Sequence, residues 1–343
     1  MAFTTVNKGS LFMNPKIYTG NGTARTIDVG FQSDFTWIKN RGNDDNHYLF
    51  DSVRLATNYL NSDSNAAQTT GSSTSLTGFV SDGFTVGTGG GVNLNGMATV
   101  SWNWKAGTTS IPSGSSTAPT AVSINATAGF GIYAYTGTGV TGRTIAHGLN
   151  SAPKMMIVKR LNSTRDWGVY HSSLANTEHL ELNNTDAKVT SNLWGNTTPT
   201  SSLIYLGNDG QSNGNTDPYI MYAFADVQGF SKMGSYVGNG SGSDGPFIFT
   251  GFTPSLIMFK STSTTGGWEI HDNKRDPFNV SSKRLFPNLS NAEATEDYVD
   301  FVSNGFKFRT GDANGNTNGV SYSYMAFAEA PLVGTNNIPA NAR

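Results

Sequence analysis

One short sequence motif, called the repeated word below, occurs three times in the chain: Tyr18-Thr-Gly-Asn-Gly22, Tyr135-Thr-Gly-Thr-Gly139 and Tyr236-Val-Gly-Asn-Gly240. A short run that is mostly apolar follows each word and ends in a lysine, at Lys39, Lys159 and Lys260. Lys159 lies 120 residues after Lys39, and Lys260 lies 101 residues after Lys159. A period of about one hundred residues is too long for one turn of a solenoid. It predicts tandem domains that are each large enough to build a core.

Further landmarks keep the same spacing. Trp167 and Trp268 are also 101 residues apart, and His47 takes the matching position in the first copy. Each copy then closes on an aromatic strand, and these strands end in Trp104, Phe224 and Phe327. Because several landmarks share one offset, we expect the three copies to superpose, since a slip of one residue would turn every side chain to the wrong face.

The repeated segments have the pattern of β-strands. Phe35 and Trp37 alternate with their neighbours, as in a strand with two different faces. Residues 155–158 and 256–259 are apolar throughout, which fits strands covered on both faces. Asn-Gly and Asp-Gly pairs, the typical residues of tight hairpins, separate these segments. The sequence therefore predicts an all-β protein of three tandem β-sandwich domains, lectin-like or of the jelly-roll type.

The repeat also sets the predicted domain boundaries. Residues 106–119 are rich in Gly, Ser and Pro, as expected of a linker. The predicted organisation is an N-terminal arm (1–15), repeat 1 (16–106), a linker (107–127), repeat 2 (128–228), repeat 3 (229–331) and a C-terminal tail (332–343).

Composition excludes several classes of protein. The net charge is −2 with no basic stripe, so the attraction that dominates nucleic-acid binding is missing. The chain has no cysteine, which excludes disulfides and thiolate metal sites. It has no apolar run of about 18 residues and no signal-peptide pattern at its start. We therefore expect neither nucleic-acid binding nor membrane insertion.

We expect no metal site, no cofactor and no catalytic residues. The histidines near the repeat tryptophans fall in different copies, and no close pair has the spacing of metal ligands. Carboxylates are paired at 44–45, at 293 with 296 and at 297 with 300. They lie in polar sequence, whereas a catalytic acid needs an apolar pocket that raises its pKa.

Of the six tryptophans, five occupy repeat positions that they share with Phe, Tyr or His, which favours a place in the core. Trp194 lies outside the repeat, among polar turn residues. A tryptophan in such a place can present an apolar ring to a ligand. We therefore predict Trp194 as a surface contact, for example with a sugar.

The repeated words resemble a family encoded by marine tailed bacteriophages, among them cyanophages. The resemblance rests on Tyr18-Thr-Gly-Asn-Gly22, Leu49-Phe-Asp-Ser-Val-Arg54, Ser81-Asp-Gly-Phe84 and Tyr324-Met-Ala-Phe-Ala-Glu329, and it spans about residues 16–331. Proteins of this family are often labelled tail fibres or structural proteins. The resemblance implies a virion protein built from lectin-like β-sandwich modules, and it brings no catalytic residue with it.

The leading hypothesis is thus a non-enzymatic structural protein on the exterior of a phage particle, of the tail-fibre type, which attaches to glycan on the host surface. The alternatives are a capsid decoration or head-fibre protein that stabilises the shell, a polysaccharide depolymerase and a free-standing secreted lectin. Expected partners are a tail adaptor or the major capsid protein. With 13% charged residues, exposed sheet edges have few charges to discourage pairing, so we also expect a homo-oligomer. The resemblance to fibres favours a trimer.

Overall fold

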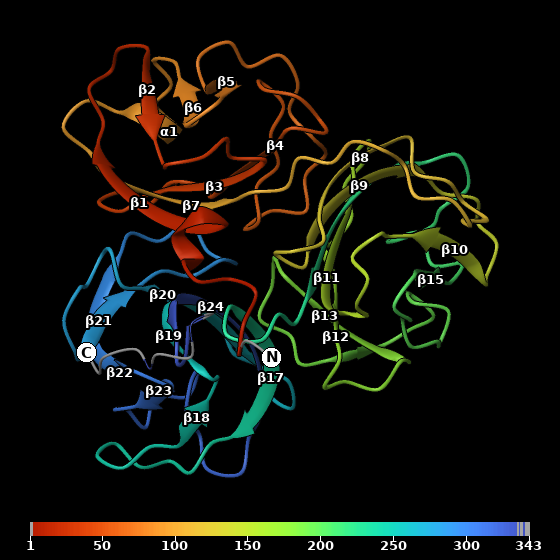
Figure 1. Ribbon diagram of the computed structural model, residues 1–343. Helices are drawn as coiled ribbons and strands as arrows, with labels where there is room; N and C mark the ends of the chain where they lie inside the picture. Colours follow the sequence, from red (N-terminus) through yellow and green to blue (C-terminus); the bar gives the residue numbers. More distant parts are fainter. Residues whose placement is uncertain (1–2, 335, 337–338, 340–343) are drawn as a thin grey trace.

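The computed structural model describes residues 3–334, 336 and 339, which form many short strands joined by turns. Three lobes surround a common centre, and each lobe comes from one stretch of the sequence (Figure 1). We name them unit 1 (residues 13–104), unit 2 (residues 121–225) and unit 3 (residues 231–331). No helix in the described part is long and apolar enough to cross a membrane. The predicted all-β fold of sandwich type is confirmed.

Unit 1 pairs a four-stranded sheet, β1-β7-β3-β4, with a three-stranded sheet, β2-β6-β5. A buried apolar cluster between them includes Ile38, Phe50 and Phe84. Its elements follow a 3-10 helix (Gly9–Leu11) and are β1 (Met13–Thr19), β2 (Arg25–Asp28), β3 (Phe35–Asn40), β4 (Tyr48–Asp51), β5 (Leu76–Val80), β6 (Gly83–Val86), α1 (Gly90–Asn93) and β7 (Ala98–Trp104).

Unit 2 contains a seven-stranded sheet, β14-β13-β12-β11-β16-β9-β8, and the pair β10-β15. Met156, Ile145 and Ile204 belong to the buried cluster that joins them. Its strands are β8 (Ala121–Asn125), β9 (Phe130–Thr136), β10 (Arg143–Ala146), β11 (Pro153–Arg160), β12 (Gly168–His171), β13 (Glu178–Glu181), β14 (Val189–Thr190), β15 (Leu203–Leu206) and β16 (Pro218–Ala225).

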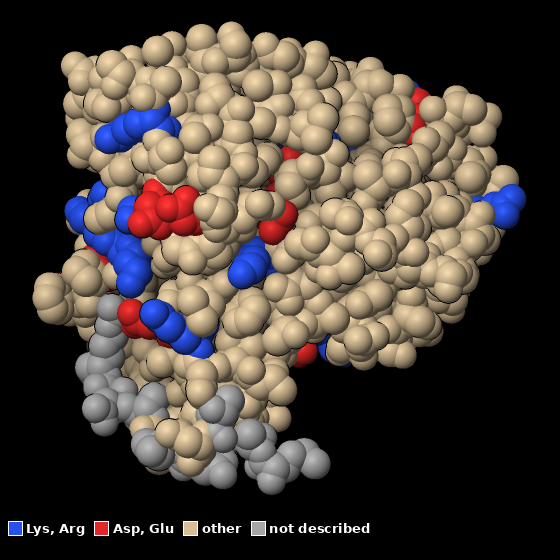
Figure 2. Space-filling model, turned by 45° about the horizontal axis from the view of Figure 1, so that its top comes forward, with Lys and Arg blue, Asp and Glu red and all other residues tan. Residues whose placement is uncertain are grey.

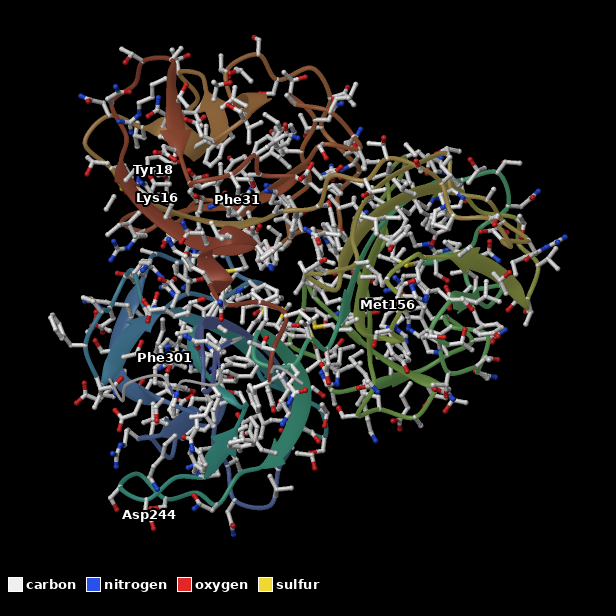
Figure 3. The ribbon with its side chains drawn as sticks, viewed as in Figure 1. Lys16, Tyr18, Phe31, Met156, Asp244 and Phe301 are labelled. Atoms are coloured by element: carbon white, nitrogen blue, oxygen red, sulfur yellow. The ribbon has the colours of Figure 1, made fainter. Side chains whose placement is uncertain are left out.

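Unit 3 pairs two four-stranded sheets, β17-β24-β19-β20 and β18-β23-β22-β21. Figure 3 shows Phe301 within this lobe, with Phe31 and Met156 in the other two. The strands are β17 (Ser231–Val237), β18 (Phe247–Phe249), β19 (Phe252–Ser261), β20 (Trp268–Asp272), β21 (Ser281–Arg284), β22 (Ala294–Val302), β23 (Gly305–Phe308) and β24 (Ser321–Pro331).

Four strands occur in the same order in all three units: β1-β7-β3-β4, β9-β16-β11-β12 and β17-β24-β19-β20. The third strand of each set lies between two neighbours and is almost entirely buried. This position explains the unbroken apolar runs at 155–158 and 256–259, because a strand covered on both faces has no solvent side on which to place polar residues.

The centre of the molecule is apolar and is shared by the three units. The last strands β7, β16 and β24 bring Trp104, Phe224 and Phe327 together, with ring centroids 5.7–6.2 Å apart and near edge-to-face geometry. The largest buried apolar cluster draws residues from all three units. The lobes therefore form one closed ring around an aromatic centre, with approximate threefold symmetry within a single chain.

The linker and arm predictions need correction. Residues 121–125, which lie within the predicted linker 107–127, form β8, which pairs with β9. Their alternate apolar residues Val122 and Ile124 are buried, which the Gly/Ser/Pro-rich sequence before them obscured. The arm includes the start of β1 and packs on its own chain: Val6 is buried, and Phe12 meets Phe230 at 5.9 Å. The tail from 332 falls largely outside the described residues.

The outer edge of the first common strand is protected differently in each unit. In unit 2, β8 covers β9. In unit 1, β1 contains Pro15, which has no N–H to offer a partner strand. In unit 3, the Asp226 carboxylate accepts the N–H of Met233 on β17 at 2.8 Å. The edges on which we based the homo-oligomer are thus partly blocked within the chain itself.

Candidate functional site

The three lysines of the repeat are fully buried at one point of the fold. Each is the penultimate residue of β3, β11 or β19, and each ammonium donates to the carbonyl of the next residue. Burial lowers the pKa of Lys39, Lys159 and Lys260 to about 8. Lys260 also donates across to Thr185 of unit 2 at 3.1 Å. These side chains close the turn after the strand, which is a structural role.

His47, Trp167 and Trp268 lie at the start of the fourth common strand, beside these lysines. Trp268 pairs with Lys260, while His47 and Trp167 directly precede β4 and β12. The Trp167 indole donates to Asn61 of unit 1 at 3.0 Å, and that of Trp268 to Glu181 of unit 2 at 2.9 Å. The His47 imidazole, held by Trp37 at 2.8 Å, faces the main chain of Phe286 in unit 3. Each of the three therefore reaches into a neighbouring unit.

We call the three contacts between units seam 1–2, seam 2–3 and seam 3–1. A main-chain hydrogen bond of the same kind crosses each seam: Gln68 to Leu161 at 2.9 Å, Lys188 to Thr262 at 3.0 Å and Glu293 to Arg41 at 2.8 Å. Leu161 and Thr262 are 101 residues apart, and Arg41 precedes Leu161 by 120. The acceptors thus keep the spacing of the repeat.

The inner part of each seam joins the end of a fourth strand to the next unit. On seam 1–2, Tyr222 donates to Asp51 at 2.7 Å, and on seam 3–1 Trp102 donates to Asp272 at 2.9 Å. An arginine three residues later, Arg54 or Arg275, pairs with each buried carboxylate. Seam 2–3 has neutral groups instead: His171 lies 3.1 Å from the carbonyl of Tyr324, and burial lowers its pKa to about 4.

A buried asparagine in each unit was missed by the sequence analysis. Asn93, Asn213 and Asn316 each accept an N–H from the repeated word and donate to two or more oxygen acceptors. The tyrosine of the same word donates to the residue just before the asparagine. Their spacings of 120 and 103 residues are close to the 120 and 101 of the lysines, and these asparagines explain the repeat of Tyr18, Tyr135 and Tyr236.

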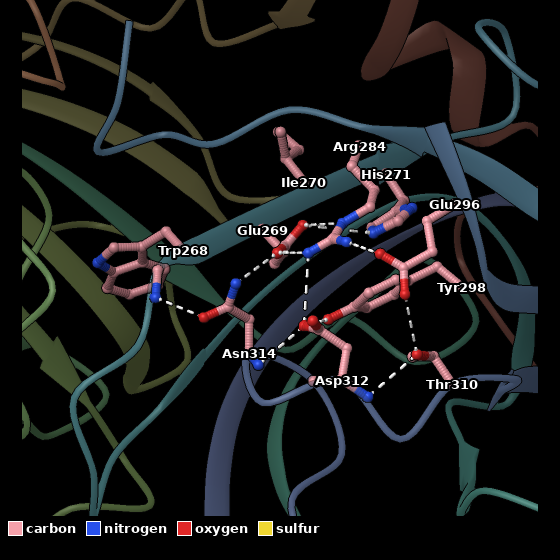
Figure 4. Close-up of polar contacts among 12 residues, drawn as sticks. Trp268, Glu269, Ile270, His271, Arg284, Glu296, Tyr298, Thr310, Asp312 and Asn314 are labelled. Carbon is pink, nitrogen blue, oxygen red and sulfur yellow. Dashed lines mark hydrogen bonds and ion pairs between the residues drawn. The ribbon is translucent and has the colours of Figure 1, made fainter. Parts of the chain in front are cut away.

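The densest group of charges lies inside unit 3 (Figure 4). Arg284 donates to both oxygens of the fully buried Glu269, at 2.6 and 3.2 Å, and contacts Glu296 and Asp312. The guanidinium lies 4.3 Å from the centroid of the Tyr298 ring, and the Tyr298 hydroxyl donates to Asp312 at 2.6 Å. Burial raises the pKa of Glu269 to about 7. Arg284 is shared by three carboxylates, so this group is a closed ion-pair network.

The carboxylate pairs noted in the sequence do not converge on a common cleft. Glu293 is bound by Arg41 and Arg275, and Glu296 by Arg284. Asp300 pairs with Arg309, while Asp44 accepts the N–H of Ala292. Within the described residues, no three His, Asp or Glu side chains are grouped so as to hold a metal ion. These carboxylates hold loops and seams together.

Trp194 is not a surface residue, so its predicted role as a surface contact is wrong. Its side chain is buried in the core of unit 2, edge-on to Tyr170 at 5.8 Å. The polar residues next to it in the sequence form a turn, and this turn directs the side chains of Leu193 and Trp194 inward, between the two sheets. Residues 192–196 are polar around this pair because the turn itself faces solvent, and the sequence alone does not distinguish the two arrangements.

The chain belongs to the family DUF7483. Residues 8–331 match this family, which is described as a domain of unknown function. No curated protein and no solved structure matches the chain. The matched span includes all three units, so the family corresponds to the whole ring and not to a single lobe.

Proposed function

We propose that the chain is a non-enzymatic structural protein on the exterior of a bacteriophage particle, where it attaches to glycan on the host surface. The observation that carries the proposal is the closed ring. The side chains that recur in the sequence, from the lysines to the seam tryptophans, hold strands, turns and units together. Such use of the repeated residues favours a rigid building block over an enzyme, whose repeated polar residues would line a cleft.

The surface agrees with an exposed building block. On the face in Figure 2, charged side chains are few and gather near one side, and most of the surface is uncharged. A surface of this kind, rich in Asn, Ser, Thr and Gly, can meet neutral polymers without strong long-range repulsion or attraction. The resemblance of the repeated words to phage structural proteins supports the same location.

A capsid decoration protein is the second candidate, and the approximate threefold symmetry of the ring is the observation that favours it. A compact body with approximate threefold symmetry can occupy a threefold axis of a capsid shell, so that one chain fills a position that otherwise needs three identical chains. Copy number separates the two candidates. Quantitative mass spectrometry of purified particles would give a few tens of chains for a tail protein and several hundred for a decoration. Absence from purified particles would contradict both.

A polysaccharide depolymerase is the rival from another class, and the fully buried Glu269 in the ion-pair network of unit 3 serves only as its control position. Host envelope polysaccharide would be incubated with the purified chain and the reducing ends counted. We expect no release above the level of Glu269→Gln. Turnover by the natural chain that this variant lacks would replace the structural proposal.

Self-association is a separate proposal. We propose a homotrimer, and light scattering of the purified chain at micromolar concentration measures it directly. A trimer would mean that the threefold arrangement occurs at two levels. A stable monomer would mean that the units of one chain have taken the place of three subunits.

A further inference from the structure

Unit 3 exposes aromatic side chains to solvent. Among the described residues, the phenylalanines with large exposed fractions are Phe247 (47%), Phe249 (51%) and Phe278 (78%), all in unit 3. Phe247 and Phe249 lie two residues apart on β18, an edge strand, so their side chains share one face. Neighbouring exposed rings form a contiguous apolar patch, and such patches mark binding sites more often than single exposed residues do.

Phe249 stands at the rim of a hollow of about 460 Å³ between β17, β18 and the connection from unit 2. The hollow is lined mainly by apolar surface, to which Phe3 contributes, and its polar and charged side chains are Asp226, Gln228, Ser231, Lys232 and Thr250. The Lys232 ammonium donates to the Phe249 carbonyl at 3.0 Å and lies 5.5 Å from the ring centroid. An apolar hollow of this size with a few fixed polar groups is the usual form of a small-ligand site.

The Asp226 carboxylate in this hollow is fixed in position. Its Oδ1 accepts the Met233 N–H at 2.8 Å, which leaves the second oxygen of Asp226 for a ligand. Burial raises the pKa of this carboxyl, as expected where solvent is partly excluded. Asp226 and Lys232 thus offer an acceptor and a donor beside an aromatic ring.

The corresponding place in unit 2 is filled by the chain itself. Gly148 and Gly251 lie in matching turns before the third common strand, both with positive φ. A Cβ on Gly148 would lie 3.0 Å from Pro112 and 3.6 Å from Ile124 of β8. A Cβ on Gly251 would meet only the Phe249 ring, at 3.8 Å. Unit 3 therefore leaves open a space that unit 2 closes.

We propose that this hollow binds a neutral pyranose ring, with its apolar C–H face on Phe249 and vicinal hydroxyls on Asp226, Gln228 and Lys232. The proposal rests on the proposed function, for which it names the glycan-contacting residues. Pyranoses combine an apolar face with a rim of hydroxyls, which matches one aromatic ring beside an acceptor and two donors. An extended peptide fits less well, because Asp226 already occupies the N–H of Met233 that an added strand would need.

The test is saturation-transfer NMR on the full-length chain with glucose, galactose, mannose, N-acetylglucosamine and their disaccharides. We expect at least one to bind with a dissociation constant on the order of 1 mM. Phe249→Ala is expected to weaken binding about tenfold. Asp226→Asn, which keeps Oδ1 for Met233, is expected to weaken it about fivefold. Phe278→Ala, which removes an even more exposed ring outside the hollow, is the control and should bind as the natural chain does.

Thermal melting of each variant separates lost binding from lost folding. Three results would overturn the inference: no binding of any sugar, unchanged binding by Phe249→Ala, or an equal loss in Phe278→Ala. Binding of an unstructured peptide that needs Phe249, without sugar binding, would overturn it in favour of strand addition. None of these results changes the amount of the chain in purified particles, so the failure of this site and the failure of the proposed function are distinguishable.

Discussion

Seam 3–1 differs from the other two seams in the chemistry of its outer contacts, since its inner carboxylate–arginine pair also occurs on seam 1–2. Seams 1–2 and 2–3 join units that follow each other in the chain, and an indole N–H crosses each to a main-chain carbonyl. Seam 3–1 joins the two units that have unit 2 between them in sequence. There Glu293 binds Arg41 through two hydrogen bonds at 2.7 and 2.8 Å and also contacts Arg275.

This difference follows from how the seams are connected. A short connection keeps two units at high local concentration, so modest contacts hold them together. Units 1 and 3 have no such connection between them, and their seam depends more on its own contacts. Charged pairs also tolerate few alternative arrangements, because a misplaced partner leaves an unpaired buried charge. The charges of seam 3–1 therefore help to define how the ring closes.

The largest expected effect comes from the inner arginine of seam 3–1. Arg275→Met would leave the fully buried Asp272 without its partner, so we expect a loss of about 3–5 kcal/mol in the free energy of unfolding. Leu174, the third residue after His171 on seam 2–3, is the matched position without a charge. Leu174→Met should cost less than about 1.5 kcal/mol. Urea unfolding measures both, and equal losses would contradict the comparison.

Disruption of the outer ion pair of seam 3–1, between Glu293 and Arg41, should lower the free energy of unfolding by a smaller amount. Glu293→Gln removes a charge that is mostly buried, with 10% of its side chain exposed, and is expected to cost about 2 kcal/mol. Hydrogen exchange should become faster at the Glu293 amide, which bonds to Arg41 across the seam. Glu178→Gln breaks the more exposed pair with Lys188 within unit 2 and serves as control, with an expected cost below about 1 kcal/mol. Faster exchange at all three seams would mean that the ring opens as a whole.

Part of this architecture could be predicted from the sequence. The fold class followed from strand patterns and turn residues, and the repeat spacing pointed to Lys39, Lys159 and Lys260, which the structure places at one position. The ion pair of Glu293 with Arg41 could not be predicted, because the two residues are 252 positions apart and the residues that match Arg41 in the other copies, Leu161 and Thr262, carry no charge. Ring closure depends on such contacts, which are specific to one seam.

The remaining failures have a local cause. Trp194 and β8 both lie in polar, turn-rich sequence. In such sequence, the orientation of the turn decides whether a side chain is buried or exposed, and composition does not. The hollow of unit 3 could not be predicted from the sequence, because Asp226 and Lys232 come together only through the connection to β17. The buried asparagines are different, since their spacing was present in the sequence and could have been used.

The hydroxyl of Ser62 tests seam 3–1 on a finer scale. It is buried and donates to the carbonyl of Pro287 in unit 3 at 2.6 Å. Ser62→Ala is expected to cost about 1 kcal/mol, because the lost donor leaves the carbonyl unpaired. On seam 2–3, Ser173 contacts Ser323 at 2.7 Å in partly exposed surroundings. Ser173→Ala should cost less, since water can replace the lost hydroxyl, and thermal melting compares the two.

The smallest expected effect is a pH dependence that distinguishes the lysines by seam. Burial lowers the pKa of Lys39, Lys159 and Lys260 to about 8 in the folded chain, against about 10.4 for an unfolded lysine. Between these values the unfolded chain binds more protons, so the free energy of unfolding should increase with pH. From pH 7 to pH 8 we expect a gain on the order of a few tenths of a kcal/mol for each lysine. Above about pH 10 the buried tyrosines oppose this gain, because burial raises the pKa of residues such as Tyr133 and their ionisation then favours unfolding.

Lysine-to-methionine variants, compared by urea unfolding at pH 7 and pH 8, would assign this slope. Each variant should remove its part of the increase, and an increase with pH that survives in the triple variant would contradict the assignment to the lysines. Glu269 acts in the opposite direction, because burial raises its pKa to about 7 and its ionisation in the folded chain then lowers stability as the pH increases. Lys260 differs from the other two because its ammonium also donates to Thr185 across seam 2–3, whereas Lys39 and Lys159 bond within their own turns. Deprotonation of Lys260 weakens a contact between units as well as a turn. Hydrogen exchange on seam 2–3, at the amide of Lys188, should therefore respond to pH in the natural chain and lose that response in Lys260→Met.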